Sequence, residues 1–198
     1  MRFQTPLLLI ASLITFVSGE AAGTRSHPRD LSVENIVDGD IMGHSQRVKR
    51  NPVLPPGKDD TKLHVWVRTD KETVTYDSSR GVNHEGLNQM MKDIGGNHVD
   101  VVIGNSHGYH EVGLQFANKD WIKKHPNGDG AEIADYWENY ITMPQETFEY
   151  RGQIDGRKTI ASIQAAAKKE ISGKTYNHQT YNCKTYALEF VKTLNAKV

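Results

Sequence analysis

The 198-residue chain has almost no cysteine, no excess of charge of either sign, and no long apolar run beyond its first residues. Its single cysteine, Cys183, excludes an intramolecular disulfide. Lys and Arg number 24, as do Asp and Glu, which argues against nucleic acid or an anionic membrane as a partner. Hydrophobic residues make up 37% of the chain, which suffices for one globular core but excludes a multi-spanning membrane protein.

The first apolar run predicts a secretory signal peptide over residues 1–19. Arg2 precedes apolar residues from Leu7 to Val17, and Val17 and Gly19 stand where a signal-peptidase site is expected. The run is about half of the roughly 20 residues that a spanning helix needs. The alternative is a buried strand at the start of the domain. We therefore expect a secreted protein without stable membrane insertion, in which the lack of disulfides is unusual.

A second segment, residues 20–50, predicts a propeptide. It is polar and aperiodic, and it ends in Arg47-Val48-Lys49-Arg50. The pair Lys49-Arg50 resembles the cleavage sites of kexin/furin-type secretory proteases, whose acidic pockets recognise paired positive charges. The alternative is a charged linker. Cleavage would leave one mature domain, residues 51–198, and a domain of this size folds without disulfides.

The mature region alternates between strand and helix patterns. We expect a β-hairpin over about 62–77, a helix capped by Asn83 and stopped by Gly95-Gly96, a buried strand at 99–103 and a second strand at 112–116. The last two should be adjacent central strands. Residues 118–145 are interpreted as an insertion with a short helix near 136–141.

The C-terminal third predicts a strand at 147–150 and a helix over about 158–171. The final helix should begin after Asn182, with Cys183 in its first turn and a buried apolar stripe behind it. These elements together predict an α+β domain in which a small antiparallel sheet packs against helices.

The expected position of Cys183 suggests chemistry. A thiol in the first turn of a helix feels the positive end of the helix dipole and free main-chain N–H groups, so its pKa should fall. Two alternatives do not involve catalysis: a small apolar residue packed under the helix, or a thiol that dimerises the chain.

A catalytic cysteine needs a histidine for proton transfer. His107 and His110 are the candidates, because their segment leads directly into the expected strand at 112–116, where a side chain is rigidly aimed. Most of the other histidines are expected to be solvated. Structural roles for both remain an alternative.

The order of these features resembles a known group of enzymes. A histidine at the start of a central strand is followed by a strand, a helix and the segment Tyr181-Asn182-Cys183-Lys184-Thr185-Tyr186-Ala187. This resembles the circularly permuted papain-like hydrolases, which include the lecithin–retinol acyltransferase-like and PPPDE-type families. The resemblance covers about the last half of the mature chain and implies a permuted papain-like fold with Cys183 as nucleophile and His110 as base.

The histidine segment departs from the family pattern, which has His-x-Gly followed by an apolar residue. Here Gly113 lies three residues after His110, so His107 stays a candidate base. The group that orients the base is open between Glu111, His64 and a backbone carbonyl. With this site the thiolate would attack an amide, ester or thioester carbonyl, so the partner would be a protein, peptide or acyl substrate.

Two further functions are weighed. Gly104-Asn105-Ser106-His107-Gly108 satisfies the G-x-S-x-G pattern of serine α/β-hydrolases, with His178 as the base. Alternatively, the chain is a secreted, non-catalytic effector or toxin-like protein on the same scaffold. Recognition would then use aromatics of the insertion: Trp121, Tyr136, Trp137 and Tyr140.

No cofactor is expected, because the sequence has no Rossmann or phosphate-loop motif. Two patterns touch on metal binding, the pair His107 and His110 and the series Asn127, Asp129 and Glu138. The glycine between the histidines opposes a helix, and the series matches a calcium loop only in outline. We therefore expect no metal site.

Overall fold

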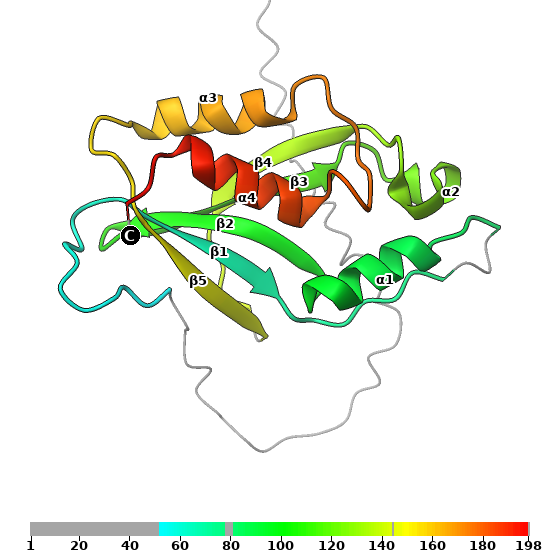
Figure 1. Cartoon of the computed structure of the whole chain (residues 1–198), viewed down its shortest axis with the longest axis horizontal. Helices are drawn as coiled ribbons and strands as arrows, with labels where there is room; N and C mark the ends of the chain where they lie inside the picture. Colours follow the sequence, from blue (N-terminus) through cyan, green and yellow to red (C-terminus); the bar gives the residue numbers. More distant parts are fainter. Residues whose placement is uncertain (1–51, 78–80, 144, 198) are drawn as a thin grey trace, which may run out of the picture. The chain divides into compact units, whose positions relative to one another are not determined.

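The computed structural model describes residues 52–77, 81–143 and 145–197. The expected signal peptide and the propeptide with Lys49 and Arg50 lie outside the described residues. The described part is α+β, as the sequence predicts. Its five strands form one antiparallel sheet in the order β4-β3-β2-β1-β5, accompanied by four α-helices (Figure 1).

The elements follow one another as five strands interleaved with helices. The strands are β1 (His64–Asp70), β2 (His98–Asn105), β3 (Gly108–Phe116), β4 (Ile133–Asn139) and β5 (Glu146–Gln153). The helices are α1 (Glu85–Ile94), α2 (Trp121–Lys124), α3 (Ile160–Ile171) and α4 (Cys183–Thr193), with a 3-10 turn η3 (Pro126–Gly128).

The centre of the sheet is the pair of strands that the sequence predicts as neighbours. β2 and β3 form a hairpin in which Asn105 pairs with Gly108, so that Ser106 and His107 make its turn. β1 lies on the other side of β2. Val101 pairs with both Val67 and Val112 across this centre, and all three valines are buried.

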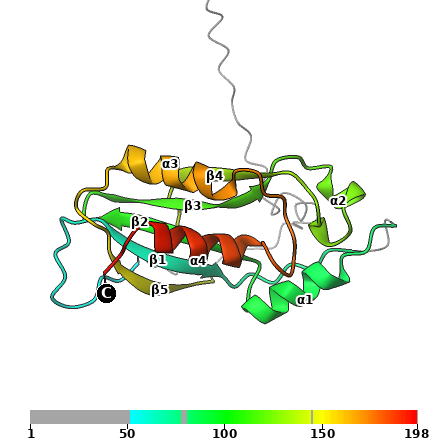
Figure 2. The ribbon, with the colours of Figure 1, turned by 45° about the horizontal axis from the view of Figure 1, so that its top comes forward.

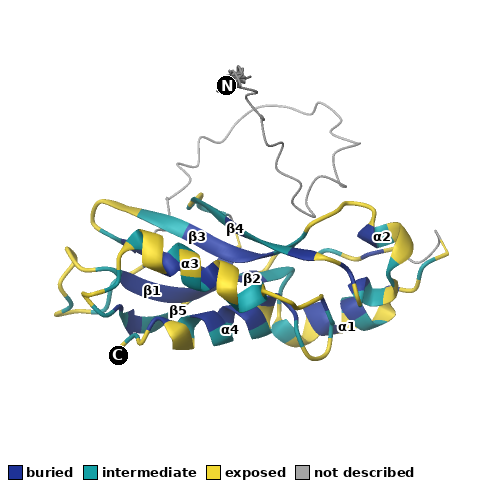
Figure 3. Cartoon of the chain, turned by 90° about the horizontal axis from the view of Figure 1, so that it is seen from above, coloured by how far each residue is buried: buried dark blue, intermediate teal, exposed yellow. Residues whose placement is uncertain are grey.

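Helices cover one face of the sheet. α4 lies over β2 and β3, α3 lies over β4, and the two helices pack against each other (Figure 2). Because side chains of a strand alternate between faces, Val67, Val101 and Val112 point to the same side and join the core with Phe190 of α4. Figure 3 shows the central strands buried and the outer side of α3 exposed.

The predicted hairpin over 62–77 is wrong in its second half. β1 ends at Asp70, which pairs with His98 of β2 on one side and Glu146 of β5 on the other. Both partner strands begin at these residues, so the chain after Asp70 has no strand beside it. Residues 71–77 are not a strand, although their β-rich composition suggests one.

The interpretation of 118–145 as an insertion with a helix near 136–141 is also wrong. Ile133–Asn139 is β4, an edge strand of the main sheet. Tyr136 and Trp137 resemble a helical stripe in sequence, but they pair with Gly113 and Val112 of β3. The Tyr136 ring lies where a side chain at position 113 would be, so the glycine makes room for it.

The other three predicted helices are confirmed, two of them with small shifts at their starts. α1 begins at Glu85, so its cap position is His84 rather than the predicted Asn83, whose side chain accepts the Glu85 N–H from one residue earlier at 2.8 Å. Its end at Gly95 is left-handed, as a glycine stop requires. α3 begins at Ile160 after a Thr159 cap, where Thr159 and Ser162 exchange hydrogen bonds.

Candidate functional site

Cys183 stands where the sequence places it, as the first residue of α4. The Asn182 side-chain oxygen caps the helix by accepting the N–H groups of Lys184 and Thr185, each at 3.1 Å. Its amide group donates to the His178 carbonyl at 2.9 Å. One side chain therefore fixes both the helix start and the loop before it.

The thiol itself is buried, with 6% of the residue exposed. Burial raises the pKa of Cys183 to about 11, although main-chain N–H groups of Val99, Lys184 and Cys183 act on the sulfur in the opposite direction. The predicted lowering of this pKa is therefore wrong. The helix start supplies the expected N–H groups, but loss of water outweighs them because the charged form is poorly solvated there.

Two tyrosines lie close to the sulfur. Burial raises the pKa of both Tyr76 and Tyr176, and the neighbouring Cys183 thiolate would raise each further. Tyr76 belongs to the segment after β1, and its main chain is held by the Asn88 side chain of α1 through two hydrogen bonds of 2.9 Å. The region around the thiol is thus closed by residues from outside α4.

His110 lies at a different part of the sheet. The sulfur contacts Val99 of β2, whereas His110 pairs with Ile103, four residues further along the same strand. At about 3.3 Å per residue, this separates the two positions by roughly 13 Å. If the pairing of β2 with β3 is continued, the residue opposite Val99 is Leu114, which is 3% exposed, rather than a histidine.

None of the proposed orienting groups binds His110. The His110 ring lies 5.3 Å from the Trp137 ring between centroids, and its Nδ1 has no hydrogen-bond partner within the described residues. His64 instead bonds the Tyr150 hydroxyl and the Asp59 carbonyl, each at 2.8 Å. Glu111 pairs with Arg68, on the face of the sheet away from His110.

His107 and Ser106 are exposed in the β2–β3 turn. β3 follows this turn directly, whereas a serine nucleophile of the α/β-hydrolase type needs a helix there. His178, the base expected in that reading, lies just before α4, whose first residue contacts the opposite end of β2. The structure therefore brings together neither His107 and Cys183 nor Ser106 and His178.

Two polar pairs in the structure are not predicted from the sequence. The His178 ring nitrogen Nδ1 lies 2.9 Å from both carboxylate oxygens of Asp129, and its main-chain N–H donates to the same carboxylate. Asp129 precedes His178 by 49 residues, so no local pattern signals the contact.

The second pair lies on the sheet face away from α3 and α4. Arg68 is 1% exposed and binds Asp100 through its Nε at 2.8 Å and through a second, short bond. The same guanidinium lies 2.9 Å from Glu111 and 3.6 Å from Glu146. Burial opposes the Arg68 charge, but Asp100 outweighs it and the pKa is raised.

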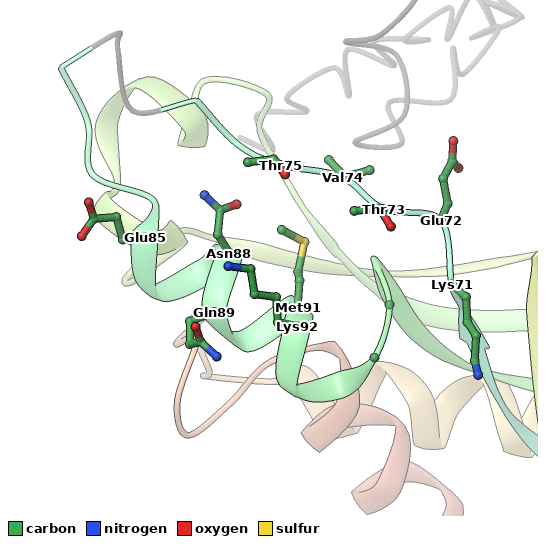
Figure 4. Close-up of a pocket in the computed structure, with 12 residues that line it drawn as sticks. Lys71, Glu72, Thr73, Val74, Thr75, Glu85, Asn88, Gln89, Met91 and Lys92 are labelled. Carbon is green, nitrogen blue, oxygen red and sulfur yellow. The ribbon is translucent and has the colours of Figure 1, made fainter.

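A groove lies beside α1, and its volume is about 460 Å³ (Figure 4). One wall is α1, which contributes Asn88, Met91 and Lys92, and the other is the extended segment Lys71–Thr75. The groove has no signature in the sequence, because residues 71–77 have the composition of a strand and are predicted as part of a hairpin.

The aromatic residues proposed for recognition are only partly available. Trp121 and Tyr136 are 8% and 5% exposed and belong to the interior. Trp121 stacks on Phe116 with 3.8 Å between ring centroids. Trp137 and Tyr140 are half-buried. Of the four, only Trp137 and Tyr140 therefore have surface to offer a partner.

Within the described ranges, no group of three acidic, histidine or cysteine side chains is arranged to hold a metal ion. Asn127 and Asp129 are engaged by Leu87 and His178, and Glu138 lies in β4. No helix in the same ranges has the length and apolar character that crossing a membrane requires. The chain matches no family model, no curated protein and no solved structure.

Proposed function

We propose that this chain is a secreted binding protein, built on a permuted papain-like scaffold, in which Cys183 is structural. The scaffold is supported by the order of the elements: an antiparallel sheet, then α3, then α4 beginning at Asn182-Cys183. The observation that carries the proposal is the state of the thiol. Its pKa is raised to about 11, and the groups that act most strongly on the sulfur in the described chain include no histidine.

The raised pKa of the thiol argues against catalysis. A thiol with this raised pKa is protonated at neutral pH, whereas the thiolate is the nucleophile. Proton transfer from the thiol to an imidazole would form the thiolate, but His110 pairs with Ile103, about 13 Å along β2 from Val99, which contacts the sulfur. Hydrogen-bond reach is about 3 Å.

The second candidate function is a thiol hydrolase or acyltransferase. The three main-chain N–H groups around the sulfur favour it, since such groups also stabilise an oxyanion. In that function the Cys183 sulfur would bond to an acyl carbon, the amine, alcohol or thiol would leave with a proton, and water would then release the acid. For this chemistry the chain would have to rearrange so that the sulfur is uncovered and a base is brought to it.

Thiol alkylation separates the two functions. The secreted protein is treated with iodoacetamide between pH 6 and pH 10, and labelling of Cys183 is followed by intact mass. A structural thiol should label slowly below pH 9 and quickly after unfolding in urea. Cys183→Ser provides the blank. Labelling of the folded protein that is already maximal near pH 6 would overturn the proposal in favour of the hydrolase.

A further inference from the structure

The segment that follows β1 is an extended chain held at both ends. At one end the Lys71 N–H donates to the Gln145 carbonyl at 2.6 Å. At the other, Tyr76 exchanges two hydrogen bonds with the Asn88 side chain. Between these anchors, the main-chain groups of Thr73–Thr75 have no hydrogen-bond partner among the described residues.

The groove runs along this unpaired stretch. Figure 4 shows Met91 pointing from α1 toward the segment, with Asn88 and Lys92 beside it. The helix is held close to β1 at its C-terminal end, because Gly96 lies against the Asp70 carbonyl with no room for a side chain. The α1 wall of the groove is therefore fixed against the end of the sheet, where the other wall begins.

We propose that this groove binds an extended peptide segment of a partner protein, which pairs as an added strand with Thr73–Thr75. The inference rests on the proposed binding function and names its partner class. Unpaired N–H and C=O groups along an extended segment complement another main chain, and strand addition of this kind supplies affinity from the backbone. Met91 lines the groove but is only 6% exposed, so the main-chain pairing supplies most of the contact.

The charges of the groove favour a peptide over a polyanion or a metal. Its rim carries two cations, Lys71 and Lys92, and two anions, Glu72 and Glu85. This balance gives no net attraction for a phosphate backbone, whose binding needs an excess of several cations. A main chain carries no net charge and is suited to such a site.

The alternation of a strand supplies a sharp test. Residues i and i+2 direct their main-chain groups to the same edge, and residue i+1 directs its groups to the other. A proline removes the N–H and tolerates extended backbone. Thr73→Pro and Thr75→Pro alter one edge of the segment, and Val74→Pro alters the other. Peptide affinity should therefore fall about tenfold or more for the variants of one edge only. Val74→Ile and Thr73→Val, which keep the N–H, are the matched controls.

The probe is a linear peptide selected from a phage-displayed random library against the secreted protein. Amide hydrogen exchange then locates it: exchange at residues 73–75 should be fast in the free protein and slowed by the peptide. Protection elsewhere, or no selected sequence, would overturn the groove proposal. Protection that grows with protein concentration alone would identify a second copy as the occupant and overturn the partner peptide. Fast Cys183 labelling with protection at 73–75 would instead overturn only the non-catalytic function.

Discussion

Arg68 and Asp100 face each other across β1 and β2 and form a two-bond ion pair inside the sheet face that carries no described helix. Each is 1% exposed, and Glu111 and Glu146 lie around the same guanidinium. The cluster thus holds three carboxylates and one guanidinium, so the arginine is the group that makes their burial tolerable.

We expect Arg68→Met to lower the free energy of unfolding by about 3–5 kcal/mol, because it leaves buried carboxylates without a countercharge. Urea denaturation followed by circular dichroism measures the change. Arg157→Met is the matched control: Arg157 pairs with Asp155 at 2.6 Å but its side chain is 90% exposed, so no measurable change is expected. Equal effects in the two variants would show that the buried cluster contributes no more to stability than the exposed ion pair.

The thiol predicts a dependence of stability on pH. Because the Cys183 pKa is about 11 in the folded chain and near 9 when exposed, the folded state holds its proton more tightly. The contribution is complete below pH 9 and is lost as pH rises toward 11, by about 2–3 kcal/mol. The unfolding free energy of Cys183→Ala, measured over pH 8–11, should lack this part of the decline. Parallel pH curves for both proteins would contradict the raised pKa.

Asn182 predicts a capping effect. Its side-chain oxygen accepts two N–H groups at the start of α4, and its amide holds the His178 carbonyl. Asn182→Ala should cost about 1–2 kcal/mol. Asn182→Asp keeps the acceptor and loses only the donor, so it should cost less. Thermal unfolding of the two variants gives the comparison, and equal losses in both would show that the loop contact matters more than the cap.

Tyr186 predicts a stabilising substitution. The residue is fully buried in α4, and its hydroxyl has no hydrogen-bond partner within the described residues. Removing a buried unpaired hydroxyl costs nothing in contacts, so Tyr186→Phe should be neutral or stabilise the protein by up to about 1 kcal/mol. Tyr136→Phe is the contrast, because that hydroxyl donates to Asp100 at 2.7 Å, and it should destabilise. A marked loss in Tyr186→Phe would reveal a partner for its hydroxyl.

What the sequence reveals correctly is local. The cap at Asn182 and the stop at Gly95 are decided by residues within one turn of each other, and both are found in the structure. The apolar runs of β2 and β3 are flanked by turn residues, which makes their pairing as a hairpin predictable. Such features depend little on the rest of the chain.

What escapes the sequence depends on distant residues. Tyr136 and Trp137 suggest a helix until Gly113 and Val112 are known to lie beside them. The thiol follows the same rule. Its helix position is readable, but the burial that raises its pKa involves Tyr76, more than a hundred residues earlier in the chain. Side-chain environment, not helix position, decides the chemistry of Cys183.

The interior position of the only sulfhydryl also bears on how the protein meets its surroundings. Two copies cannot be joined through Cys183 unless α4 is first uncovered. The described fold contains no disulfide that glutathione could reduce and no exposed thiol that an oxidising medium could capture. Moving from an oxidising to a reducing environment should therefore leave the described domain unchanged, a tolerance that disulfide-stapled exported proteins of similar size do not have.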